Sequence, residues 1–363
     1  MWNAKLISAL LEYGFVQIGN DYSLYILSKD DIFVALLVYV DDIIITDNNN
    51  SEVDNVKKFL NSKFMIKDLG LFKYFLGIEI IKGDEGLCMS QRKYCLDLLD
   101  EFGMSACKLI DTPLEVNSVL ASEASEGDDF LENITEFQKL IGKLIYLTPT
   151  RPDISYSVQT LSQHMHAPLQ SHVKAALRVL RYLKGSPGKG IYADWGKCFT
   201  RRSVSGLCLF LCGSLVSLKS KKQPTVSRSS TESEYRSLAA TTCEIIFVLK
   251  LLDDFGIHNL LPVHLFCDNK SALLLAANPV FHERSKHFET DVHIVREKNL
   301  SGLLRLEYVD SKDQVADVFT KGLCKAQHHF LSQRLGLLDY FPNKIEGGCF
   351  LFFDDLKSYV AEW

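Results

Sequence analysis

The chain has 363 residues, of which 47% are hydrophobic and 23% are charged, so it can form two or three domains with apolar cores. Its net charge of -5 argues against a uniformly basic nucleic-acid coat, and its ten cysteines include no CxxC pair and no zinc-ligand spacing. A signal peptide and an apolar run of about 18 residues are also missing, so we expect a reduced, soluble, intracellular protein (cytoplasmic or nuclear), neither secreted nor membrane-bound.

The most informative stretch near the start is FVALLVYVDDIIIT, Phe33 to Thr46. Two runs of apolar, β-favouring residues flank Asp41 and Asp42, which predicts a buried β-hairpin with acids at its turn, after a helix over residues 1–13. Adjacent carboxylates repel each other unless a cation neutralises them, and a pair of divalent ions is one solution. A merely polar turn is the alternative interpretation.

The next segments alternate in pattern. Ser51 to Phe64 has a helical apolar stripe, with Ser51 as the expected N-cap. Lys67 to Ile80 predicts two strands interrupted by glycines, and Leu87 to Met104 predicts a strand that leads into a helix. Asp111 to Glu136 contains eight acids and no base, which is typical of a linker.

Basic residues gather in the middle of the chain. Arg151 to Ser230 holds thirteen Lys or Arg and only two acids, a distribution expected for contact with a phosphate backbone, although a solvated charged face is the alternative. The nearby histidines, His164, His166 and His172, have no Cys or carboxylate at ligand spacing, so we do not expect them to bind metal. The candidate nucleic-acid-binding residues are Lys174, Arg178, Arg181, Lys184, Arg201, Arg202, Lys221, Lys222 and Arg228.

The last third predicts strands and helices that carry separate acids. The expected elements are a hairpin over 203–220, a helix over 230–255, a strand over 263–267, a helix over 271–277, a strand over 303–309 and a helix over 313–321 capped by Ser311. Glu234 lies on the long helix, Asp268 directly follows the strand, and Asp317 lies on the last helix. Acids at the carboxyl ends of strands are typical of sites in open α/β sheets.

These motifs resemble one known family. YVDD followed by IIIT resembles the reverse transcriptase of copia-type LTR retrotransposon Pol polyproteins, and SRSSTESEYRSLA, CDNKSA and DQVADVFTK resemble the ribonuclease H domain of the same polyproteins. The resemblance implies a mixed α+β and α/β chain. Its parts are a truncated polymerase palm with the region that follows it (1–110), an acidic linker and helical connector (111–190), a ribonuclease H-like mixed sheet with helices (191–325) and a divergent tail (326–363).

The resemblance also implies metal chemistry. In the family, the two YVDD aspartates, here Asp41 and Asp42, bind catalytic metal in the polymerase. The ribonuclease H acids gather Mg²⁺ (or Mn²⁺) to cleave RNA in RNA–DNA hybrids, and they correspond here to Glu234, Asp268, Asp317 and a first-strand aspartate for which Asp194 is the candidate. Several carboxylates are needed because two hard cations require many oxygen ligands.

Two departures from the family pattern bear on activity. No third palm carboxylate lies in a matching sequence motif upstream of YVDD. The first strand of the nuclease is also shortened, so that Asp194 aligns with the second aspartate of the family motif and not with the first. We therefore expect the polymerase to be inactive and both family activities to be impaired. The alternative is a catalytically dead nucleic-acid-binding remnant or a pseudogene product. The oligomeric state is not determined by the sequence.

Overall fold

The fold is described from a computed structural model, which covers residues 2–40, 42–71, 73–83, 86–116, 118, 120–194, 206–220, 229–277, 289–339 and 359–362. The chain divides into two compact units. The first comprises Met1–Leu76, Ile246–Leu260 and Phe350–Trp363, and the second comprises Gly77–Ile245 and Leu261–Cys349. Within the described parts of the chain, no helix is both long and apolar enough to cross a membrane.

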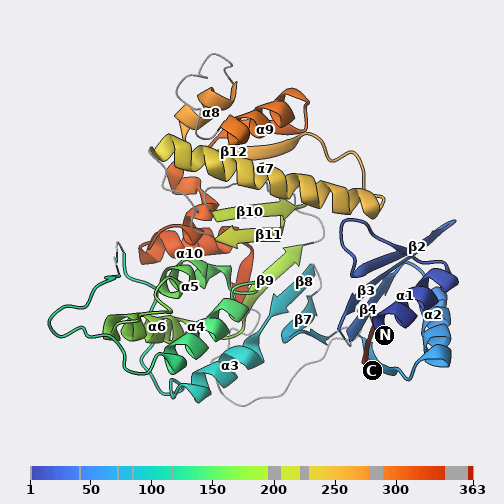
Figure 1. Ribbon diagram of the computed structural model, residues 1–363, viewed down its shortest axis with the longest axis horizontal. Helices are drawn as coiled ribbons and strands as arrows, with labels where there is room; N and C mark the ends of the chain where they lie inside the picture. The colour runs from blue at the N-terminus through green and yellow to red at the C-terminus, as the bar shows by residue number, and fades with distance from the viewer. Residues whose placement is uncertain are drawn as a thin grey trace. The chain divides into compact units, whose positions relative to one another are not determined.

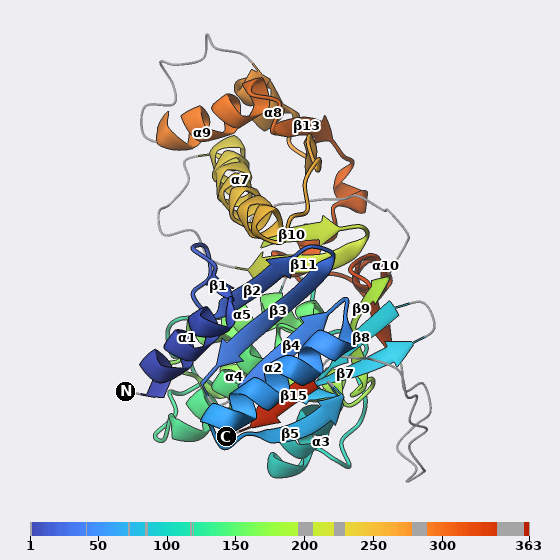
Figure 2. The same cartoon turned by 90° about the vertical axis from the view of Figure 1, so that its right-hand side faces the viewer.

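The first unit is a sheet with helices on it. Its strand order is β1 (Val16–Gln17), β2 (Leu24–Lys29), β3 (Ile32–Tyr39), β4 (Asp42–Asp47), β15 (Tyr359–Glu362) and β5 (Lys67–Leu71), and β6 (Tyr74–Phe75) follows in the chain. The helices α1 (Trp2–Tyr13) and α2 (Asn50–Lys63) lie on one face of this sheet (Figure 2). The helix and the hairpin predicted at the start of the chain are thus confirmed.

Strand β3 is buried on both faces, which explains its continuous apolar sequence. Val34 and Leu36 belong to a core shared with α1 and α2. The alternate residues Phe33 and Leu37 pack with Leu251 and Phe255 from the end of the long helix α7 (Ser230–Asp254) and the residue after it. Since successive side chains point to opposite faces of a strand, one strand contributes to two cores.

The cap of α2 differs from the prediction. Asn49, in extended conformation, accepts hydrogen bonds from the backbone N–H groups of Ser51 and Glu52 through its side chain. The prediction of Ser51 as the N-cap is therefore wrong, because the helix begins one residue earlier, at Asn50. Asparagine and serine are comparable caps, so composition alone did not separate them.

The second unit begins with a helical core. The helices α3 (Arg92–Glu101), α4 (Thr135–Leu147), α5 (Ser155–Ser162) and α6 (Gln170–Leu183) pack around one cluster of buried apolar residues, which includes Leu99, Leu144 and Leu180 (Figure 1). In the same unit, β7 (Ile78–Gly83), β8 (Gly86–Ser90), β9 (Lys189–Asp194) and β14 (Leu337–Asp339) pair in the order β14-β9-β8-β7, all antiparallel.

The rest of the second unit contains two separate strand pairs. Strands β10 (Gly206–Leu211) and β11 (Ser214–Ser220) form the predicted hairpin, with Cys212 and Gly213 at positive φ in the turn. Strands β12 (Val263–Cys267) and β13 (Leu304–Tyr308) run parallel. The remaining elements are α8 (Lys270–Ala277), α9 (Glu289–Leu300), the 3₁₀ turns η1 (Pro152–Ile154), η4 (Ser311–Asp313) and η5 (Val315–Phe319), and α10 (Lys325–Arg334).

The prediction of a single α-helix over residues 313–321 is wrong. Gln314, at φ -72 and ψ 101, adopts an extended conformation between the two 3₁₀ turns, so a continuous helix cannot form. The segment that follows is ordered by packing: Leu331 of α10 and Leu335, the residue after this helix, are buried in the same core as Ile191 of β9. Residues 325–339 therefore contribute to the core of the second unit.

A buried ion pair connects several of these elements. Arg151 donates to both carboxylate oxygens of Asp153, at 3.0 and 2.9 Å, and the two side chains are only 1% and 0% exposed. Tyr182 of α6 donates to Asp153 at 2.6 Å, and Lys189 of β9 lies 3.3 Å from it. Burial by itself raises the pKa of the Asp153 carboxyl, but the charges of Arg151 and Lys189 hold it well below its usual range.

Arg151 and Asp153 also reach two further segments through backbone groups. Arg151 donates to the carbonyl oxygen of Ser186 at 2.8 Å, and a ring nitrogen of His328 on α10 lies 3.1 Å from the carbonyl oxygen of Asp153. The network thus joins η1, α6, β9 and α10 at one point.

Replacing Asp153 by asparagine should destabilise the protein by about 3–5 kcal/mol, because Arg151 is left buried without its counter-charge. Urea unfolding at pH 7 measures this loss. The matched control is Glu101→Gln, which removes an exposed partner of Lys139 and Lys143 and should change stability little. The contribution of Asp153 should persist above the ordinary aspartate pKa of about 4 and disappear as the pH falls below it. Equal stability of the two variants would contradict the prediction.

Candidate metal centre

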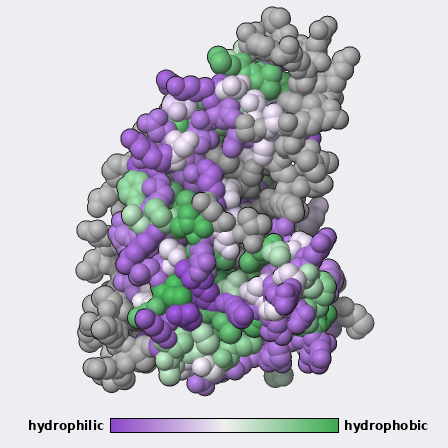
Figure 3. Space-filling model, turned by 90° about the vertical axis from the view of Figure 1, so that its left-hand side faces the viewer, coloured by the Kyte–Doolittle hydropathy of each residue, from purple (hydrophilic) through white to green (hydrophobic). Residues whose placement is uncertain are grey.

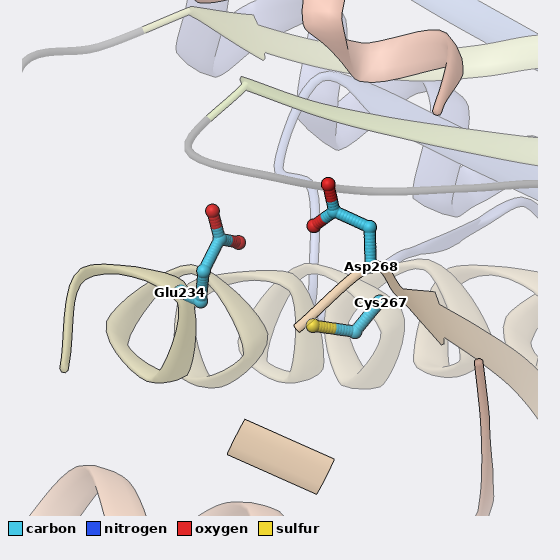
Figure 4. Close-up of side chains that lie close together, drawn as sticks. All are labelled: Glu234, Cys267 and Asp268. Atoms are coloured by element: carbon cyan, nitrogen blue, oxygen red, sulfur yellow. The ribbon is translucent and has the colours of Figure 1, made fainter. Parts of the chain in front are cut away.

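Three side chains with metal-ligand atoms meet at the end of β12. The carboxylate oxygens of Glu234 and Asp268 and the sulfur of Cys267 all lie within 4.8 Å of one another. Figure 4 shows the two carboxylates directed to the same side, Glu234 from α7 and Asp268 from the residue that follows β12. The sequence placed these two acids on a helix and at a strand end, and the structure brings them together.

Local packing explains why the two acids face each other. Leu265, Phe266 and Cys267 are buried, so β12 ends within the core and Asp268 emerges at its carboxyl edge. On α7, Leu238 is 1% exposed and lies one turn after Glu234, which places Glu234 on the buried side of the helix.

Ser311 holds one oxygen of Asp268. Its hydroxyl donates to Asp268 Oδ2 at 2.7 Å. The parallel pairing of β12 with β13 places Tyr308 beside Cys267, so the residues after both strands leave the same edge of the sheet. The prediction that Ser311 caps a helix is wrong, since Ser311 is itself the first residue of η4 and its hydroxyl binds Asp268. Its contact with Asp268 had no signal in the sequence, because 43 residues separate the two.

Glu234 is electrostatically strained. Burial, and to a smaller extent the negative charges of Asp268 and Asp317, raise the pKa of its carboxyl to about 7, although the positive charge of Lys321 opposes them. One of its oxygens, Oε2, is buried and finds no hydrogen-bond partner among the described residues. A buried carboxylate oxygen without a donor is suited to accept a cation.

Asp317 is linked to this group through charge and is itself paired. Its side chain is 7% exposed, and the ammonium of Lys321 lies 2.9 Å from it. Burial raises the pKa of Asp317, as does the charge of Asp268, whereas Lys321 lowers it. Asp317 is not one of the three residues whose ligand atoms share the 4.8 Å limit. The i,i+4 spacing of Asp317 and Lys321 in DVFTK was the available sequence signal for this pair.

Cys267 does not suit a hard cation. Burial raises the pKa of its thiol to about 12, with the charges of Glu234 and Asp268 acting in the same direction. The backbone N–H of Asn269 donates to its sulfur at 3.4 Å. The thiol therefore stays protonated at neutral pH, and Mg²⁺ and Mn²⁺ prefer oxygen ligands. The donor set that fits such ions consists of the carboxylates, with Cys267 forming a wall of the site.

The other predicted metal ligands lie elsewhere or outside the described residues. Asp194 ends β9, which pairs with β8 and β14, whereas β12 pairs with β13. The side chain of Asp194 and the whole of Asp41 are outside the described residues. Asp42 begins β4 opposite Tyr39. The metal roles of Asp41, Asp42 and Asp194 stay predictions.

Most of the predicted basic residues in and just after α6 have protein partners. Arg178 donates to Glu115 at 2.8 Å and to Thr112, Arg181 donates to the carbonyl oxygen of Lys108, and Lys184 donates to that of Cys107. These side chains hold the acidic linker against α6, whereas Lys174 is exposed. Arg201, Arg202, Lys221, Lys222 and Arg228 lie outside the described residues. Nucleic-acid contact by this set stays a prediction.

His172 uses both ring nitrogens, with Nδ1 accepting from the N–H of Leu169 and Nε2 lying 2.9 Å from the carbonyl oxygen of Ala121. It thus supports the start of α6.

On the face drawn in Figure 3, the described residues are mainly polar, and apolar side chains form separate small patches.

Comparison with known proteins assigns the family. Residues 1–116 match the family described as reverse transcriptase (RNA-dependent DNA polymerase). The chain is 40% identical over 357 residues to the retrovirus-related Pol polyprotein from transposon RE1 of Arabidopsis thaliana, covering 94% of this chain and 24% of that protein. It is 31% identical to a putative transposon Ty5-1 protein of Saccharomyces cerevisiae, covering 68% of this chain and 84% of that protein. This chain belongs to the copia-type retrotransposon Pol polyproteins.

Family membership confirms the resemblance to copia-type Pol polyproteins. An uncharacterized mitochondrial protein of Arabidopsis thaliana is also similar, at 43% identity over 58% of this chain and 92% of its own length. The chain spans about a quarter of the RE1 polyprotein, 24% of its length. No solved structure gives a significant match.

Replacing Ser311 by alanine should weaken the binding of Mn²⁺ about tenfold, because partners that orient metal-binding carboxylates typically contribute that much to affinity. Isothermal titration of the purified chain with Mn²⁺ measures it. Ser301→Ala is the matched control, since the exposed hydroxyl of Ser301 donates only to the carbonyl oxygen of Lys298. Unchanged affinity in Ser311→Ala would show that the contact with Asp268 does not support the site.

Proposed function

We propose that the second unit is a ribonuclease H-like unit that binds an RNA–DNA hybrid and holds a divalent cation, Mg²⁺ or Mn²⁺, at Glu234, Asp268 and Asp317. The observation that carries the proposal is the convergence of Glu234 and Asp268 at the carboxyl end of β12, with Glu234 Oε2 buried and unpartnered among the described residues. The reaction class is hydrolysis of a phosphodiester bond in the RNA strand.

The residues of the chain have separable roles in this reaction. When bound, a divalent cation activates water and stabilises the leaving oxygen. Glu234 and Asp268 supply the oxygens that hold the cation, and Ser311 fixes the orientation of Asp268. The burial of Glu234 and Asp317 keeps water away from the carboxylates and strengthens their attraction for positive charge.

We propose that cleavage by this chain is slow. Asp317 is already paired with Lys321, and the strand that ends at Asp194, β9, pairs with β8 and β14 and not with β12. These two observations also favour the second candidate function, a nucleic-acid-binding remnant without catalysis. The two functions differ in a single measurable property, cleavage of the hybrid.

For the reverse transcriptase part, we propose that the YVDD hairpin is the metal-binding tip of an ancestral RNA-directed DNA polymerase, and that this chain alone does not polymerise. The β3–β4 pairing, with Tyr39 opposite Asp42, supports the first statement. The second is supported by the sequence upstream of the hairpin, which offers no third palm carboxylate in a matching motif.

The purified chain should cleave the RNA strand of an RNA–DNA hybrid slowly and only with Mg²⁺ or Mn²⁺, and it should leave double-stranded DNA intact. Asp268→Asn should abolish cleavage, because it removes a carboxylate from the cluster. Asp310→Asn, at an exposed acid of the neighbouring loop, should retain it. Absence of cleavage by the unaltered chain would favour the non-catalytic remnant, and equal cleavage by Asp268→Asn would point to a contaminating nuclease.

Binding to duplexes should be weak, independent of sequence and steeply dependent on salt, because phosphate contacts release counterions. Lys174→Gln should lower the slope of log affinity against log salt by about one. Lys139→Gln is the matched control, since Lys139 is paired with Glu101 at 2.9 Å. Fluorescence anisotropy at several salt concentrations measures both slopes. Binding that does not change with salt would contradict the prediction.

A further inference from the structure

Lys321 occupies a fixed position beside the acidic cluster. After η5, the backbone N–H groups of Thr320 and Lys321 both donate to the carbonyl oxygen of Asp317, at 3.2 and 3.0 Å. This turn places Lys321 one helical turn beyond Asp317, on the same side of the backbone. Its ammonium lies 2.9 Å from each oxygen of the Asp317 carboxylate.

The two partners differ greatly in exposure. The side chain of Asp317 is 7% exposed, whereas that of Lys321 is 53% exposed. A carboxylate buried near other carboxylates requires a positive charge close by, because its own solvation is lost. Lys321 provides that charge from the solvent side, and its influence extends to Glu234, whose pKa it lowers. One ammonium therefore compensates two acids of the cluster.

We propose that Lys321 is an internal counter-cation that competes with a divalent metal ion for Asp317, so that metal binds fully only when the ammonium leaves the carboxylate. The inference rests on the metal site proposed above and adds a residue that controls its occupancy. The exposed, flexible side chain of Lys321 allows this exchange, since it can turn into solvent without opening the core.

A purely structural ion pair makes a different prediction. An i,i+4 pair with an exposed lysine contributes little to stability in general, and its loss does not alter affinity for a metal ion. Competition instead links the two properties: removing the ammonium destabilises the metal-free protein and strengthens metal binding. The stability lost without metal should therefore be recovered when metal is saturating.

The test uses the full chain and Mn²⁺ as the probe. Isothermal titration should show about tenfold tighter binding to Lys321→Met than to the unaltered chain, the ratio expected when a competing interaction of modest strength is removed. Thermal unfolding with EDTA and with saturating Mn²⁺ should show a larger metal-induced rise in Tm for Lys321→Met. Lys321→Arg, which retains the positive charge, should behave as the unaltered chain.

Two controls make the outcome specific. Lys325→Met removes another exposed lysine, which pairs with Asp111 at 3.0 Å, and should leave Mn²⁺ affinity unchanged. Glu234→Gln introduced together with Lys321→Met should abolish the gain, which places it at this cluster. Lys321→Gln replaces Lys321→Met if the latter fails to fold by circular dichroism.

The results separate this inference from the proposed function. Equal Mn²⁺ affinity and equal metal-induced stabilisation of Lys321→Met and the unaltered chain overturn the role of Lys321 and leave the metal site standing. Absence of Mn²⁺ binding by every variant overturns the metal site and this inference together. Tighter binding by Lys321→Met that requires Glu234 supports both.

Discussion

The buried ion pair between Arg151 and Asp153 is the constraint on which the second unit depends. A charge without solvent is tolerated only with its partner, so the segments that supply Arg151, Tyr182, Lys189 and His328 must come together in one arrangement. The 3₁₀ turn that carries Asp317 belongs to the adjoining core, where Val315, Val318 and Phe319 pack with Leu331. The ion pair thus helps to position one of the site's acids from a distance.

The same physical rule acts at the candidate metal centre with a different outcome. Glu234 and Asp317 are largely removed from water near Asp268, and, among the described residues, no buried arginine pairs with them as Arg151 pairs with Asp153. Ser311 and Lys321 supply a hydroxyl and an exposed ammonium in its place. Incomplete compensation lowers stability but preserves an attraction for cations, and carboxylates buried in this way are typical of functional sites. Stability and metal affinity are therefore opposed in our proposal.

Membership in the copia-type Pol polyproteins defines the ancestry of the chain. The proposed level of activity depends on which sheets its acid-bearing strands join. Strands β9, β10 and β12 belong to three different sheets in the described structure, so the acids at Asp194 and Asp268 are carried by different sheets. Strand β9 pairs with β8 on one edge and with β14 on the other, and not with β10 or β12. The proposed slow hydrolysis follows from this arrangement.

Much of the fold and part of the site could be predicted from the sequence, because strands, long helices and tight turns depend on neighbouring residues. Alternation and apolar runs predicted β3, β4 and β12 and the helix α7, and thereby located Glu234 and Asp268. Tertiary structure alone decided the rest: Ser311 reaches Asp268 across 43 residues, and Arg178 binds Glu115 across 63 residues instead of facing solvent. Such contacts depend on how distant segments pack, and a local pattern carries no information about that packing.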